Sequence, residues 1–162
     1  MIAIRSGVVA SLVVLGMGVL VSREALPAAA PETAASPVGL WRTFDDKTGK
    51  ARGIVRIYEQ DGKLFGRLER SFKPGAEKRV CSVCTDDRKD APMLGLVIIR
   101  DLKPADGEFT GGTILDPDNG DVYRCKLRLE AGGTRLLVRG YLGISLFGRS
   151  QTWERLDSLP PA

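Results

Sequence analysis

The chain has 162 residues, a formal net charge of +4 and no histidine. Without histidine, neither a Ser-His-Asp nor a Cys-His catalytic arrangement can form, and the commonest transition-metal ligand is missing. Positive and negative side chains are interspersed and form no long run of one sign, which excludes the clustered basic face needed to bind nucleic acid. We therefore predict a single domain that is not an enzyme and uses no cofactor or metal.

The N-terminal segment has the pattern of an export signal. Arg5 precedes an apolar run over residues 7–21, and small residues follow at 27–30. The run is shorter than the roughly 20 residues that span a bilayer comfortably. We predict a signal peptide over residues 1–24 and a periplasmic or secreted protein. An uncleaved signal that anchors the chain to the inner membrane is the alternative, because neither candidate cleavage site has ideal flanking residues.

The remainder divides into a linker and one β domain. Residues 25–36 are rich in Ala and Pro and carry too little apolar surface to offset the entropy of ordering, so we predict a linker there. Residues 37–157 contain short runs of β-forming residues separated by turn signals such as Asp61-Gly62, with no helical periodicity. The predicted strands cover residues 38–44, 53–59, 63–70, 95–102, 108–115, 121–130, 134–141 and 145–156.

Eight strands with mostly short connections predict a closed barrel, because closure removes the exposed edges of a sheet. Residues 71–94 form the one long gap between predicted strands. The sixth strand alternates as a barrel wall requires, with Tyr123, Cys125, Leu127 and Leu129 on one face and Arg124, Lys126 and Arg128 on the other. The fold class is therefore all-β, an eight-stranded up-and-down antiparallel barrel.

The first and last strands carry a resemblance. Gly39-Leu40-Trp41 resembles the signature with which lipocalin-like barrels begin, where the indole closes one end and an arginine of the last strand lies over it. In the last strand, Arg149 and Arg155 share the parity of Trp153. A guanidinium over an indole contributes about 0.5 to 2 kcal/mol.

Several further motifs make the resemblance specific. They are Leu94-Gly95-Leu96 and the runs at residues 111–127, 136–143 and 146–155. With these motifs, residues 37–156 resemble a bacterial family of exported proteins labelled domain of unknown function 2147. The resemblance implies a lipocalin-like (calycin) β-barrel in the cell envelope or outside the cell. It implies no established activity and transfers no catalytic residue.

The three cysteines fall into a pair and a single thiol. Cys81 and Cys84 lie in a predicted loop, not at the start of a helix in a βαβ unit as a thioredoxin-like dithiol requires. A zinc site would need a second pair. In an exported protein we expect a disulfide that stabilises the loop by about 2 kcal/mol. Strand parity places Cys125 inside the barrel as an inert apolar residue.

The candidate ligand-binding residues are aromatic or polar side chains expected to face the barrel interior. They are Trp41, Tyr58, Tyr123, Tyr141, Phe147, Arg149, Gln151, Trp153 and Arg155. Buried Arg and Gln groups require partners or a polar ligand. We predict binding of a small amphipathic ligand with an apolar body and a polar or anionic head, held by Arg149 or Arg155. We expect no nucleic acid partner and no stable membrane insertion once the signal is removed.

Two alternative functions remain open from the sequence. A completely filled barrel would serve as an envelope structural or protein-interaction module, with its partner surface in residues 71–94. A thiol-redox protein would use Cys81 and Cys84. The run Asp116–Asp121 lacks the register of a calcium loop and is predicted to be a turn.

Overall fold

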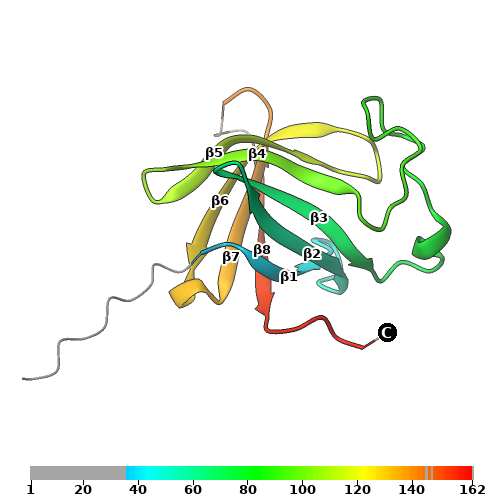
Figure 1. The fold of residues 1–162 in the computed structure, drawn as a ribbon, viewed down its shortest axis with the longest axis horizontal. Helices are drawn as coiled ribbons and strands as arrows, with labels where there is room; N and C mark the ends of the chain where they lie inside the picture. Colours follow the sequence, from blue (N-terminus) through cyan, green and yellow to red (C-terminus); the bar gives the residue numbers. More distant parts are fainter. Residues whose placement is uncertain (1–35, 145, 147, 162) are drawn as a thin grey trace, which may run out of the picture. The chain divides into compact units, whose positions relative to one another are not determined.

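The strands close into a single antiparallel barrel. The structure is a computed structural model and describes residues 36–144, 146 and 148–161. In this part of the chain eight strands follow one another around the ring in sequence order, and β8 pairs with β1 (Figure 1). The strands are β1 (Gly39–Phe44), β2 (Ala51–Gln60), β3 (Lys63–Ser71), β4 (Val97–Ala105), β5 (Glu108–Leu115), β6 (Val122–Glu130), β7 (Arg135–Tyr141) and β8 (Gly148–Leu156). The predicted fold class is confirmed.

Short turns join the strands at one end of the barrel. Asp61-Gly62 joins β2 to β3 with φ of 52° and 70°, and Asp106-Gly107 joins β4 to β5 with φ of 48° and 78°. Both pairs supply the two positive φ values that a tight hairpin requires. Asp106-Gly107 by itself makes the β4–β5 turn, so the turn does not include the preceding Pro104. Pro104 therefore stays in the β4–β5 ladder, opposite Phe109.

The other connections lie at the opposite end of the barrel and are longer. Consecutive strands run in opposite directions, so successive connections alternate between the two ends. The longer connections cover residues 45–50, 72–96, 116–121 and 142–147. The 72–96 connection, drawn in green in Figure 1, contains the 3-10 helix η1 (Ala76–Lys78) and an isolated bridge between Val80 and Pro92. β4 begins at Val97 instead of the predicted residue 95, and β8 begins at Gly148. The two ends of the barrel therefore differ in the length of their loops.

Side-chain alternation places the core inside the ring. On β6, Cys125 and Leu127 are fully buried, whereas Arg124 and Arg128 are exposed. The same alternation leaves Ile57 buried on β2. The inward face predicted for the sixth strand is confirmed. Burial of these aliphatic side chains is the main term that favours the closed ring.

Arg155 and Trp41 seal the end that carries the short turns. The Arg155 Cζ atom lies 4.3 Å from the centroid of the Trp41 ring, and Trp41 Nε1 donates a 2.8 Å hydrogen bond to the Pro37 carbonyl. The guanidinium nitrogens donate to three main-chain carbonyl oxygens, those of Gly133 (2.6 Å), Val38 (3.0 Å) and Ser36 (2.6 Å). The arrangement of indole and arginine expected for a lipocalin-like barrel is present.

The barrel closes through contacts among its own described residues. All strand pairings and all the closing contacts above join residues within the compact unit 33–162, so we expect this unit to fold without residues 1–32. Among the described residues, no helix has the length and apolar character needed to cross a membrane. Apart from Ser36, the predicted signal peptide (1–24) and linker (25–36) lie outside the described residues.

Candidate binding cavity

A cavity opens at the end of the barrel that carries the long connections. Its volume is about 480 Å³. Its inner wall is apolar and is formed by buried side chains from five strands and the 72–96 connection: Val55, Met93, Ile98, Leu115, Val138 and Trp153. An eight-stranded barrel can fill its interior or hold one small ligand. In this barrel space remains on the side opposite Trp41.

Three side chains of β8 line the cavity at increasing depth. Arg149 lies near the mouth, 62 % exposed and ion-paired with Asp46; Gln151 comes next, and buried Trp153 is deepest. Trp153 Nε1 donates a 3.1 Å hydrogen bond to Gln151 Oε1. Within the described part of the chain, the Gln151 amide nitrogen has no protein partner. The Gln151 amide therefore provides a hydrogen-bond donor between the charged mouth and the apolar interior.

The mouth has an excess of positive charge. Four cationic side chains line it, Arg52, Lys73, Arg79 and Arg149, together with two carboxylates, Asp116 and Asp118, and a third carboxylate, Asp46, pairs with Arg149. Arg52 lies 3.7 Å from Asp116 and also pairs with Asp118, which accepts a 2.5 Å hydrogen bond from Lys73.

One of these cations has no carboxylate partner among the described residues. Arg79 is exposed and has no ion pair with any residue that the structure describes. Desolvation and, secondarily, the Arg52 and Arg79 guanidinium groups lower the pKa of Lys73 below its ordinary value. The mouth therefore favours an anionic or strongly polar group.

The structure brings five of the nine predicted site residues to the cavity: Tyr123, Tyr141, Arg149, Gln151 and Trp153. Trp41 and Arg155 share their strand faces with cavity residues but lie at the sealed end. Tyr58 stacks on Phe65, with centroids 5.8 Å apart and Arg67 over its ring, and does not line the cavity. Its neighbour Ile57 faces inward, so Tyr58 faces out. Phe147 lies outside the described residues.

The sequence did not predict the site cations that come from β2 and from the 72–96 connection. Arg52 lies near the start of β2, and Lys73 and Arg79 follow the end of β3. In an antiparallel barrel these positions share one end with the start of β8. Their position at this shared end, which follows from the predicted order of strands, could have grouped them with Arg149.

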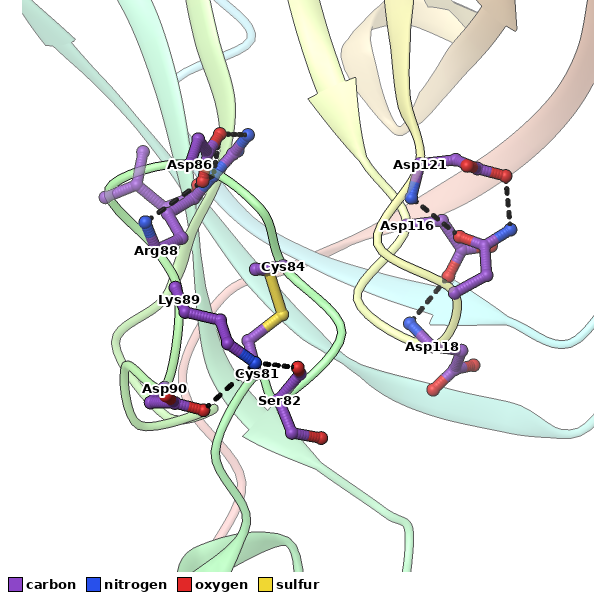
Figure 2. Close-up of a disulfide and its surroundings, with 12 residues drawn as sticks. Cys81, Ser82, Cys84, Asp86, Arg88, Lys89, Asp90, Asp116, Asp118 and Asp121 are labelled. Carbon is purple, nitrogen blue, oxygen red and sulfur yellow. Dashed lines mark hydrogen bonds and ion pairs between the residues drawn. A yellow bond between two sulfur atoms is a disulfide. The ribbon is translucent and has the colours of Figure 1, made fainter.

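The cysteines occupy the positions predicted for them. Cys81 and Cys84 form a disulfide and are 0 % and 2 % exposed (Figure 2). Cys125 is free and fully buried, and desolvation raises the pKa of its thiol to about 12. Among the described residues, no three His, Cys, Asp or Glu side chains are grouped to hold a metal ion.

The disulfide turn supports one side of the cavity mouth. Figure 2 shows it facing the β5–β6 turn that carries Asp116 and Asp118. Gly120 in that turn has φ of 83°, and a Cβ atom there would lie 2.2 Å from the Val83 carbonyl oxygen. Only glycine permits this close approach of two backbones. The contact fixes the position of the two mouth carboxylates relative to Arg52.

Comparison with known proteins assigns the chain to a family. Residues 39–155 match the family described as "Uncharacterized protein conserved in bacteria (DUF2147)". The chain is a member of the DUF2147 family. The DUF2147 barrel is similar to a solved structure titled "Protein HP1028 from the human pathogen Helicobacter pylori belongs to the lipocalin family". The TM-score is 0.67 and the identity 17 %, over 76 % of this chain and 84 % of that one.

The structural likeness establishes the fold alone: this DUF2147 protein is a lipocalin-like barrel. A search of curated proteins found no match. The motifs at both ends of the barrel, including Gly39-Leu40-Trp41, lie within the matched range.

Proposed function

We propose that this DUF2147 barrel binds a small ligand with an apolar body and a polar or anionic head. The observation that carries the proposal is the cavity of about 480 Å³, apolar inside and cationic at its mouth. Small-molecule sites are typically concave, mostly apolar and of about 300–1,000 Å³, with a few polar groups that orient the ligand. A lipocalin-like fold is consistent with this use, and the cavity argues against a completely filled barrel.

The arrangement of the wall suggests how the ligand lies. Its apolar body would contact Val55, Val138 and Trp153, where each buried methylene contributes about 0.8 kcal/mol. Its head would meet the Gln151 amide nitrogen and Arg149. Arg155 takes no part, because its guanidinium is engaged at the sealed end. We do not extend the proposal to thiol exchange, since Cys81 and Cys84 are both buried and exchange requires access to a sulfur atom.

Tryptophan fluorescence with two matched amphiphiles tests the proposal. We expect laurate to change the emission of the wild type and dodecanol, its neutral equivalent, to bind more weakly. Arg149→Gln should weaken laurate binding by up to about fivefold, because a largely exposed charge pair contributes at most ~1 kcal/mol. The same substitution should leave dodecanol binding unchanged.

A second variant and a second method test whether the fluorescence change reports ligand binding. Trp153→Phe should remove most of the fluorescence change while native mass spectrometry still detects the complex. Wild-type protein that binds neither amphiphile by either method, and that carries no ligand when purified from its own compartment, would contradict the proposal.

A further inference from the structure

Three large aliphatic side chains project from the connection between β7 and β8. Leu142, Ile144 and Leu146 are 64 %, 62 % and 77 % exposed. These are the three most exposed large apolar side chains among the described residues; the next, Phe72 and Val80, are 44 % exposed. Single exposed apolar residues are ordinary, but a local cluster costs solubility and marks an interaction site. We call these three residues the apolar tip.

The apolar tip lies beside the cavity mouth. Leu142 itself lines the cavity, and the strand residues that flank the connection, Tyr141 and Gly148, pair with each other and also line it. Arg149 follows directly. A surface that covers the tip would therefore face the opening into the barrel.

The charge around the mouth selects the kind of surface. Four cations line the mouth with two carboxylates, and Asp46 pairs with Arg149, so one positive charge is in excess. It is that of Arg79, which is exposed with no ion pair among the described residues. Basic side chains next to a membrane gain about 1 kcal/mol each from an anionic leaflet. Aliphatic side chains flanked by cations have the composition of a segment that enters the headgroup region of such a leaflet.

The size of the tip favours lipid over a protein partner. A stable protein interface buries about 800 Å² on each side and usually centres on aromatic or arginine anchors. Three aliphatic side chains on one loop cannot supply that area. They suffice for insertion into a bilayer interface, where each buried apolar group contributes independently.

We propose that the open end of the barrel docks on an anionic lipid membrane, with Leu142, Ile144 and Leu146 inserted among the headgroups. This deepens the proposed function and rests on it: the ligand class becomes a membrane amphiphile with an acyl chain and an anionic head. In the docked orientation the amphiphile moves between the leaflet and the cavity past Arg149 without crossing bulk water. The sealed end, with Arg155 over Trp41, faces away from the membrane.

Vesicle flotation tests the docking. The protein is the barrel unit, residues 33–162, so that the apolar run at 7–21 makes no contribution. The vesicles contain phosphatidylcholine either alone or with phosphatidylglycerol. We expect flotation with the anionic vesicles only, and weaker flotation at high salt because the attraction is screened. Replacing the tip by Leu142→Ser, Ile144→Ser and Leu146→Ser should weaken it roughly tenfold or more.

A matched variant controls for loss of apolar surface in general. Val38 and Leu159 are 39 % and 40 % exposed and lie near the sealed end, next to the start of β1 and after β8. Val38→Ser with Leu159→Ser should float like the wild type, and circular dichroism checks that both variants fold. Equal flotation of the tip variant and the wild type would overturn the inference. So would a dimer of the wild type in solution that the tip variant abolishes.

Laurate binding in solution separates this inference from the proposed function. For this comparison the substitutions are limited to Ile144→Ser with Leu146→Ser, because Leu142 lines the cavity. This double variant should bind laurate as the wild type does, because monomeric laurate needs no membrane. Wild-type protein that binds laurate but never floats would overturn docking and leave the proposed function standing. Flotation that depends on the tip, without any laurate binding, would support docking and contradict the proposed function.

Discussion

Arg88 shows how a single charged residue organises the longest connection. It is 4 % exposed, yet each of its three guanidinium nitrogens donates a hydrogen bond. Nε donates to both oxygens of Asp86 at 3.0 Å, Nη2 donates to Asp86, and Nη1 donates to the Val97 carbonyl at 3.1 Å. A buried charge is tolerated when it is paired and hydrogen-bonded in this way. Arg88 thereby joins the 72–96 connection to the start of β4.

The Asp86 carboxylate predicts a specific loss of stability in acid. Hydrogen bonds from Arg88 lower its pKa from 3.8 to about 2. Because the folded-state pKa lies below the unfolded one, the stabilisation is complete above about pH 4 and is lost as the pH falls through about 2. Urea unfolding should show Asp86→Asn to be less stable than the wild type at pH 7, with a difference that shrinks between pH 4 and 2.

Asp90 provides the control for this experiment. It lies in the same connection and is exposed, and its one ion pair among the described residues is with Lys89 at 3.5 Å. Asp90→Asn should change the free energy of unfolding little at any pH. A difference between Asp86→Asn and wild type that stays constant from pH 7 to about pH 2 would show that the Asp86–Arg88 pair does not titrate as described.

At the scale of elements, the disulfide turn and the β5–β6 turn meet at Gly120. An alanine there would meet the Val83 carbonyl oxygen as well as adopting a positive φ. We expect Gly120→Ala to lower the free energy of unfolding by about 1–3 kcal/mol, measured by thermal or urea denaturation. Gly107→Ala is the matched control, since its φ is 78° but no atom lies within 4 Å of the added Cβ. Equal losses of unfolding free energy in the two variants would mean that the contact between the Gly120 turn and Val83 does not contribute to the effect.

The predictability of each element depends on how local its determinants are. Asp61-Gly62 and the alternation around Cys125 are local signals, and the strands they predict end within a few residues of the observed ones. The 72–96 connection depends on Arg88 reaching Val97, which no local pattern encodes. Similarly, the parity of β8 predicts that Arg149, Gln151 and Trp153 share a face, but not which end of the barrel is open.

At the scale of the whole molecule, the ring closes through a short ladder between β1 and β8. Three residues of each strand are paired there, whereas β7 and β8 pair over seven. These pairs lie toward the sealed end, so the contacts of Arg155 with Trp41 and with the Ser36 and Val38 carbonyls reinforce this short ladder. Toward the open end, the first residues of β8 have no β1 partner in the ladder. Arg149 lies there and pairs with Asp46.

The short ladder between β1 and β8 predicts that Arg155 stabilises the closed ring more than any exposed arginine does. Hydrogen bonds to a charged group contribute about 1.5–3 kcal/mol and a cation–π contact about 0.5–2 kcal/mol. Arg155 is only partly buried, so we expect Arg155→Ala to cost about 2 kcal/mol in urea denaturation. Arg155→Lys should recover little, because an ammonium cannot reach three carbonyls in a fixed fork. Arg128→Ala, which removes an exposed pair with Glu130, should cost less than about 1 kcal/mol.

Because Arg155 lies at the end opposite the cavity, Arg155 variants that remain folded should bind laurate as the wild type does. Weakened binding without lost stability would place Arg155 in the site instead of at the closure of the ring.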